Sequence, residues 1–215
     1  YQDLSFNLDF GNTKLGRFSL FGIGGRSDID FLGSEIDEND LFAAEDEDSY
    51  VESAFGAIGL KHNLIIGDRT YIRTVIGTSG NGNTFNQDRY FGLGTTAEQK
   101  IKFTEVDNSE SRITLSSYVN SKINARQTIR AGILYENISQ NAYTLDRENE
   151  PDLDGDGLPD WRTIFDFEGS FGIVQPYVQT QYRLSEKLKF NAGLHSQYST
   201  LNEQFVVEPR LSLAY

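Results

Sequence analysis

The sequence contains no cysteine and no methionine, and only one tryptophan and four prolines among 215 residues. The lack of cysteine excludes disulfides and thiolate metal sites. No stretch approaches about eighteen consecutive apolar residues, which excludes a transmembrane helix. Membrane-spanning strands are still allowed, because lipid-facing and lumen-facing residues alternate in them and average out as polar. Since the chain opens on Tyr1 and lacks an initiator methionine, we expect a processed or partial chain.

Positive charge is also scarce, with 19 Lys and Arg against 32 Asp and Glu and a formal net charge of −13. Nucleic-acid binding needs a basic face that neutralises phosphates, so we expect no nucleic-acid partner. The acids are concentrated in residues 31–49, which carry eight acids and no Lys or Arg, and in residues 146–166. These two stretches are typical of long solvated loops.

Apolar and polar residues alternate along most of the chain. Near the C-terminus Phe190, Ala192 and Leu194 alternate with Asn191, Gly193 and His195. No comparable stretch keeps a helical period, so the sequence predicts an all-β chain. We expect strands at about 2–10, 17–30, 50–63, 70–80, 111–121, 127–138, 170–184, 187–199 and 206–215.

The connections between these strands alternate in length. Short links follow the first, third, fifth and seventh strands, long links at 31–49, 81–110 and 139–169 follow the second, fourth and sixth, and the link after the eighth is intermediate. This layout is typical of an outer-membrane barrel with periplasmic turns and extracellular loops. Residues 99–106 (QKIKFTEV) also alternate, and we place them inside a long loop, as a hairpin extending above the membrane.

The odd number of strands carries a further prediction. Nine antiparallel strands cannot close on themselves, and open edges in lipid would leave backbone groups unpaired. We therefore expect residues 1–215 to be a consecutive segment of one larger outer-membrane β-barrel domain. The remaining strands would lie outside this chain.

The run DLDGDGLPDW places aspartates at alternate positions, with Gly157 allowing a sharp turn. Calcium takes six to eight oxygen ligands, and such a loop can supply them. The twelfth position is Thr163 where an EF-hand has Glu, so the run more closely resembles the calcium loops of thrombospondin type 3 repeats. The alternative is a solvated acidic loop. The predicted structural Ca²⁺ ligands are Asp152, Asp154, Asp156, the Leu158 carbonyl and Asp160.

No motif predicts catalysis. The two histidines, His62 and His195, lie on predicted strands without a neighbouring metal ligand, and no serine sits in a nucleophile elbow. We interpret the Glu45–Asp48 run as part of a solvated loop, and we expect no enzymatic activity. Aromatic residues near strand ends predict interfacial girdles. They are Phe31, Tyr50, Tyr71, Tyr118, Tyr135, Tyr182, Tyr198 and Tyr215.

Four segments resemble the barrel of TonB-dependent outer-membrane receptors of the Bacteroidota type, which carry a carboxypeptidase-regulatory-like N-terminal domain. They are GRFSLFGIGG (16–25), AIGLKHNLII (57–66), SYVNSKINARQTIRAGILY (117–135) and LKFNAGLHSQYSTLNEQFVVEPRLSLAY (188–215). The resemblance implies a 22-stranded barrel in the bacterial outer membrane. It also implies a lumenal plug, coupling to the TonB complex through regions outside this chain, and, where one exists, a surface lipoprotein as partner.

These features favour part of a TonB-dependent active transporter that takes up a scarce nutrient through the outer membrane. Its lumen face would meet the plug or the solute through Gln175, Gln179, Asn191, His195, Gln197, Glu208 and Arg210. One alternative is a secreted or surface β-protein with calcium-stabilised loops that acts in adhesion. Such a protein should lack the alternation of short and long links. Another is a small porin-like barrel of eight or ten strands.

Overall fold

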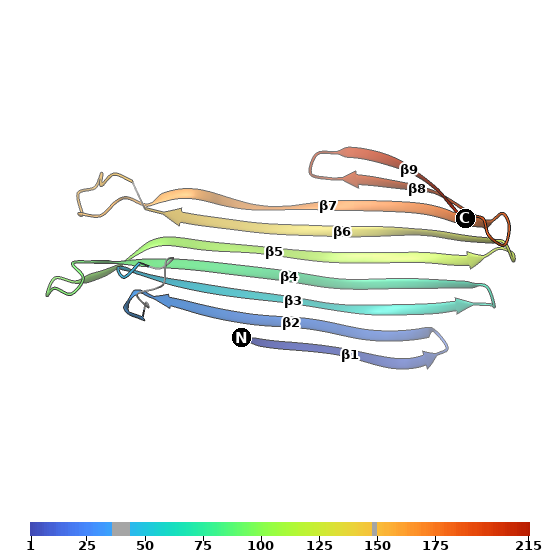
Figure 1. The fold of residues 1–215 in the computed structure, drawn as a ribbon, viewed down its shortest axis with the longest axis horizontal. Helices are drawn as coiled ribbons and strands as arrows, with labels where there is room; N and C mark the ends of the chain where they lie inside the picture. The colour runs from blue at the N-terminus through green and yellow to red at the C-terminus, as the bar shows by residue number, and fades with distance from the viewer. Residues whose placement is uncertain (36–43, 148–149) are drawn as a thin grey trace.

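The computed structural model describes residues 1–35, 44–147 and 150–215, and these residues are almost entirely β-strand (Figure 1). The all-β prediction is confirmed. A single 3-10 turn covers Gly33–Glu35. The strands are β1 (Gln2–Thr13), β2 (Gly16–Leu32), β3 (Glu47–Ile66), β4 (Thr70–Phe91), β5 (Gln99–Lys122), β6 (Gln127–Asp146), β7 (Arg162–Arg183), β8 (Lys189–Ser199) and β9 (Gln204–Ala214).

The strands form one antiparallel sheet in which each strand pairs with the next along the chain. The sheet is not closed, and β1 and β9 lie at its two edges (Figure 1). No helix in the described part of the chain is long and apolar enough to cross a membrane.

The links at one end of the sheet, which we call the turn end, are two to five residues long. They are residues 14–15, 67–69, 123–126 and 184–188. The opposite, loop end carries the links 33–46, 92–98, 147–161 and 200–203. The alternation of short and long links is therefore confirmed for the first seven strands. The link after β8 is a four-residue turn, shorter than the intermediate length expected from the sequence.

Several strands run much further toward the loop end than the sequence predicts. Residues 99–106 are the first part of β5 and pair with the last residues of β4, so the predicted loop at 81–110 shrinks to residues 92–98. The predicted hairpin is therefore present, but the placement of residues 99–106 inside a loop is wrong, because they continue β5 in the sheet. Likewise, β6 and β7 extend into the predicted link 139–169.

Successive side chains along each strand point to opposite faces of the sheet. We name the two faces after consecutive residues of β3, the Leu60 face and the Lys61 face. On the Leu60 face, the turn-end half of β3 to β7 is a largely apolar band nine residues long, between the register levels of Ile66 and Ile58. This length matches the roughly 9–11 residues that a tilted strand needs to span a bilayer. The band carries no Asp, Glu, Lys or Arg, and its polar members are Thr and Ser residues, His62 and Asn137. The band contains Ile58, Leu60, Leu64, Ile72, Ile76, Ile113, Leu115, Val119, Ile129, Ile133, Val174 and Val178.

The polarity of both faces reverses above a row of small residues at the level of Gly56, Gly80 and Ser111. Toward the loop end, the Leu60 face becomes acidic, with Glu52, Asp107 and Asp166. The Lys61 face is polar beside the band and gains aromatic and aliphatic side chains above it. They include Ile23, Phe55, Phe85, Phe165 and Phe167.

The sheet has very little core of its own. Among the described residues, Phe103 and Ile138 are the buried hydrophobic side chains, whereas the band residues Ile76, Ile113 and Ile133 are each more than 40% exposed. No second layer in the described chain covers the apolar band, since all the described strands lie in one sheet, in which each strand pairs with its sequence neighbours.

The predicted aromatic girdle is correct for some residues and wrong for others. Tyr135 and Tyr198 lie on the Leu60 face at one register level with Val174, near the upper rim of the band, and Tyr182 lies at its lower rim. Tyr71 and Tyr118 instead lie on the Lys61 face, because Tyr71 pairs with Ile65 and Tyr118 pairs with Arg73, which both lie on that face. These two tyrosines are therefore not girdle residues.

Candidate functional site

A hollow of about 720 Å³ lies on the Lys61 face between β5 and β9, beside the apolar band of the opposite face. Its side chains include Arg130, Gln175, Tyr177, Gln179, His195 and Arg210. Because successive side chains of a strand point to opposite faces, the residues between those of the apolar band place these polar groups on the other face. Five of the seven predicted lumen residues line this hollow: Gln175, Gln179, Asn191, His195 and Arg210.

The polar groups of the hollow bind one another across neighbouring strands. His195 Nε2 lies 3.2 Å from Gln175 Oε1, and His195 Nδ1 lies 3.6 Å from Glu208 Oε2. Arg210 donates to the same Glu208 oxygen at 2.7 Å. The predicted residue Gln197 lies on this face closer to the loop end, opposite Val206. The arrangement can hold a polar solute or a polar protein surface.

Sequence reasoning missed the cationic and aromatic part of this hollow. The Arg130 guanidinium lies 4.8 Å from the centroid of the Tyr118 ring, and Arg130 Nε donates to Asn120 Oδ1 at 3.3 Å. The available signal was Gly132, which stands opposite both Tyr118 and Tyr177 and leaves room for their rings. A cation stacked on a ring, with polar groups beside it, is a common way to bind a polar ligand.

Replacement of Gly132 by alanine should destabilise the hollow by about 1–2 kcal/mol, because overpacking forces its neighbours to shift. An added Cβ would lie 2.7 Å from Tyr118 Cβ and 2.8 Å from Tyr177 Cζ. Denaturant unfolding of the lipid-reconstituted protein measures the effect. Gly56→Ala is the matched control, because the nearest atom to its Cβ would be 3.9 Å away. Equal effects of the two substitutions would contradict the close-packing explanation.

The two histidines lie on opposite faces of the sheet, His62 on the Leu60 face and His195 on the Lys61 face. His62 stacks on Phe18 with ring centroids 4.4 Å apart, and its Nε2 lies 2.7 Å from the Leu15 carbonyl oxygen. His195 belongs to the polar hollow described above.

A second polar cluster lies at the loop end of β3, β4 and β5, on the Leu60 face. The carboxylate of Asp48, which is 3% exposed, accepts hydrogen bonds from Lys100 Nζ (2.7 Å), Tyr90 Oη (2.8 Å) and the Gly33 N–H (2.8 Å). Lys100 Nζ also donates to Tyr50 Oη at 2.6 Å and lies 3.4 Å from Asp88. The interpretation of residues 45–48 as solvated loop is therefore wrong for Asp48, whose side chain joins three strands and the Gly33 turn.

Asp48 and Lys100 stabilise each other in their ionised forms. Burial alone would raise the pKa of Asp48, but the hydrogen bonds from Lys100, Tyr90 and Gly33 outweigh it and lower that pKa to about 2. The hydrogen bond to Asp48 raises the pKa of Lys100 in turn. The cluster is thus a fixed ion pair that ties the loop-end tips of the strands together.

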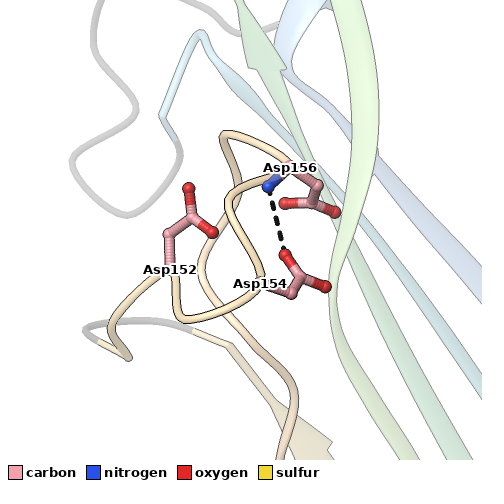
Figure 2. A group of neighbouring side chains, drawn as sticks. All are labelled: Asp152, Asp154 and Asp156. Carbon is pink, nitrogen blue, oxygen red and sulfur yellow. Dashed lines mark hydrogen bonds between the residues drawn. The ribbon is translucent and has the colours of Figure 1, made fainter.

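The predicted calcium loop lies between β6 and β7 at the loop end. Figure 2 shows Asp152, Asp154 and Asp156 on one tight loop, where one carboxylate oxygen from each lies within 4.8 Å of the others. Gly155 and Gly157 have positive φ values of 79° and 87°, which favour glycine. The turn is held by N–H groups of Gly155 and Gly157 that donate to the Asp152 carboxylate at 2.7 and 3.0 Å.

The other two predicted ligand residues take different places in the loop. Asp160 is not in the group of three, and its carboxylate accepts a hydrogen bond from the Leu153 N–H at 3.2 Å. The N–H of Leu158 donates to Asp156 Oδ1 at 2.8 Å. At the base of the loop the Arg147 guanidinium lies 4.1 Å from the Trp161 ring centroid. Calcium binding stays a prediction, with three carboxylates gathered as it requires.

If the loop binds calcium, chelation should speed proteolytic cleavage within residues 150–161 several-fold, because three repelling carboxylates lose their counter-ion. Limited proteolysis of the membrane-embedded protein, with and without a chelator, measures this. Asp154→Asn should abolish the calcium protection. Glu150→Gln, a carboxyl of the same loop that pairs with Arg162, should retain it. Identical digestion with and without calcium would count against the site.

No protein-family model and no curated protein matches the chain. Among solved structures, the outer membrane transporter YddB from Escherichia coli is similar at 10% identity with a TM-score of 0.41, over 98% of this chain and 35% of that chain. The translocator domain of the autotransporter NalP from Neisseria meningitidis is similar at 12% identity with a TM-score of 0.36, over 98% of this chain and 72% of that one. The chain spans about a third of the length of the Escherichia coli transporter.

Proposed function

We propose that this chain forms part of the barrel wall of a TonB-dependent transporter in the bacterial outer membrane. The apolar band of the Leu60 face contacts lipid, and the polar hollow of the Lys61 face lines the lumen. The turn end lies in the periplasm and the loop end outside the cell. Nutrient uptake through such a wall needs a plug and further strands, which other parts of the protein supply.

The observation that carries this proposal is the apolar band. It has the height of a bilayer-spanning strand, it continues across neighbouring strands at one level, and it stops at a single row of small residues. Side chains such as Ile76 and Ile113 are about half exposed there, and contiguous exposed apolar surface of this size is rare in soluble proteins. A lipid surface accounts for all of it.

The strand tips extend well beyond the band, by eleven residues in β3 and thirteen in β4. The acidic outer surface of these tips is suited to water and not to lipid. This supports a wall that rises above the membrane and encloses a vestibule with the predicted calcium loop at its rim.

The adhesin alternative is less well supported. A β-sandwich would cover its apolar face with a second sheet, whereas the described strands form one sheet with little buried apolar surface. A small closed porin would need an even number of strands, and the described chain contributes nine to an open sheet.

Two measurements test the proposal with the full-length protein. Membrane fractionation should place it in the outer membrane, and uptake of its solute by intact cells should stop when a protonophore collapses the inner-membrane proton gradient. Recovery of a soluble, lipid-free protein would overturn the membrane assignment. Uptake that continues without the gradient would overturn TonB dependence and leave a passive barrel.

A further inference from the structure

The loop-end half of β7 has a neighbour on one side only. β7 pairs with β6 along its whole length, but its pairing with β8 ends at Ile173 opposite Ser199, because residues 200–203 turn the chain back into β9. Figure 1 shows β7 running toward the loop end well past the β8–β9 hairpin. Residues 162–171 therefore form an open edge above the membrane level, created by a short turn within the chain.

The direction of the free backbone groups follows from Gly172. Its N–H donates to Thr200 Oγ1 at 2.7 Å and its carbonyl accepts from the Thr200 N–H at 2.9 Å, so both groups point to the β8 side. In an antiparallel strand these directions alternate from residue to residue. The register of β7 with β6 is unbroken from Phe165 to Tyr182. Hence the N–H and C=O groups of Asp166, Glu168 and Ser170 point out of the open edge.

The only protective features of this edge are the acidic side chains of Asp166 and Glu168 and a register shift at Ile164, just before the regular part of the strand. Natural sheets blunt exposed edges with proline, lysine or a bulge, and residues 165–171 (FDFEGSF) contain no proline, no lysine and no register shift. In the described part of the chain, none of the three outward-pointing residues has a backbone hydrogen-bond partner on that side. The six groups are spread along roughly 14 Å of strand.

We propose that the β7 edge binds an extended peptide segment of a partner protein, in which basic residues alternate with apolar ones. Asp166 and Glu168 stand on the Leu60 face of the edge, and Phe165 and Phe167, 59% and 52% exposed, stand on the opposite face. An added strand would place its alternate side chains beside these two pairs, so Lys or Arg matches the carboxylates and an apolar residue matches the rings.

A second copy of this chain does not fit the same edge. Two β7 edges paired antiparallel would bring Asp166 and Glu168 of each copy opposite carboxylates of the other, and like charges directly opposite destabilise a strand pair. The acidic residues Asp107 and Glu52 further along the same face add to this repulsion.

Peptide binding to the full-length protein in detergent or nanodiscs tests the proposal. A fluorescent ten-residue peptide that alternates lysine with valine should bind, and N-methylation of alternate amides, which removes strand hydrogen bonds but no charge, should weaken it at least tenfold. A peptide with glutamate in place of lysine should bind at least tenfold more weakly. Failure of the lysine peptide to bind, or equal binding of the N-methylated peptide, would overturn the proposal.

Variants of the protein separate edge pairing from simple charge attraction. Glu168→Pro removes an outward N–H at a position where an edge strand tolerates proline, and should reduce peptide binding at least tenfold. Glu168→Gln keeps the backbone N–H of the edge and should reduce peptide binding only several-fold. Asp28→Asn, which lies on β2 far from the edge on the same face, should not change peptide binding. Unchanged binding by the proline variant, or protein dimerisation in place of peptide binding, would refute the edge site. Neither result depends on whether transport requires TonB.

Discussion

Arginine in place of Ile133 is expected to destabilise the sheet in a lipid bilayer by roughly 2–4 kcal/mol, the cost of a cationic side chain on the lipid face near the bilayer midplane. Ile133 lies at the middle level of the five that make up the apolar band, opposite Ser117 and Pro176. It is 42% exposed, and neither of the residues opposite it carries a charge that could pair with the arginine.

Leu134→Arg is the matched control. Leu134 is the next residue of β6, but it lies on the Lys61 face beside Gln175, where a guanidinium meets polar groups and water. We expect it to cost less than about 1 kcal/mol. Unfolding of the lipid-reconstituted full-length protein in denaturant gives both values. Equal destabilisation by the two arginines would mean that the Leu60 face does not contact lipid.

The turn-end half of this fold could be predicted from the sequence because its two faces differ in polarity at alternate residues. Val174, Pro176 and Val178 lie on one face, and Gln175 and Gln179 lie on the other. Strict period-two alternation therefore predicted the strands, their faces and most of the polar hollow.

The parts of the strands above the membrane could not be predicted in this way. In residues 79–91 (SGNGNTFNQDRYF) the outer face meets water, so lipid imposes no apolar alternation there, and the segment has the composition of a loop. It is strand because β5 and β3 pair with it on both sides, which is a long-range cause. The same reasoning applies to residues 107–112 and to the beginning of β7.

Contacts between residues far apart in the sequence could not be predicted either. Asp48 and Lys100 are 52 residues apart in the chain, and a register of three strands brings them together. By contrast, the calcium motif could be recognised because its three carboxylates lie within five consecutive residues.

Removal of the Asp48 charge should open the loop-end tips of β3 to β5. A partner removed from a fully buried ion pair costs about 3–5 kcal/mol; because the Lys100 side chain is 35% exposed and partly hydrated, we expect about 2–3 kcal/mol for Asp48→Ala. Hydrogen exchange at the Gly33 amide, which donates to Asp48, should accelerate by roughly 30–100-fold. Asp88→Asn is the control, because Asp88 lies 3.4 Å from the same lysine, and it should cost less than about 1 kcal/mol.

Protonation of Asp48 should open the strand tips as the substitution does, and it should do so only at low pH. The pKa of Asp48 is lowered from 3.8 to about 2 in the folded protein, so the unfolded tips bind a proton first as the pH falls. The stability that the ionised carboxylate contributes is complete above about pH 4 and declines as the pH falls through the folded pKa, near 2. Exchange at Gly33, corrected for its intrinsic pH dependence, should therefore be constant from pH 7 to 5 and rise below 4. Asp48→Ala should abolish that rise, and a rise between pH 6 and 5 would show that another group controls the opening.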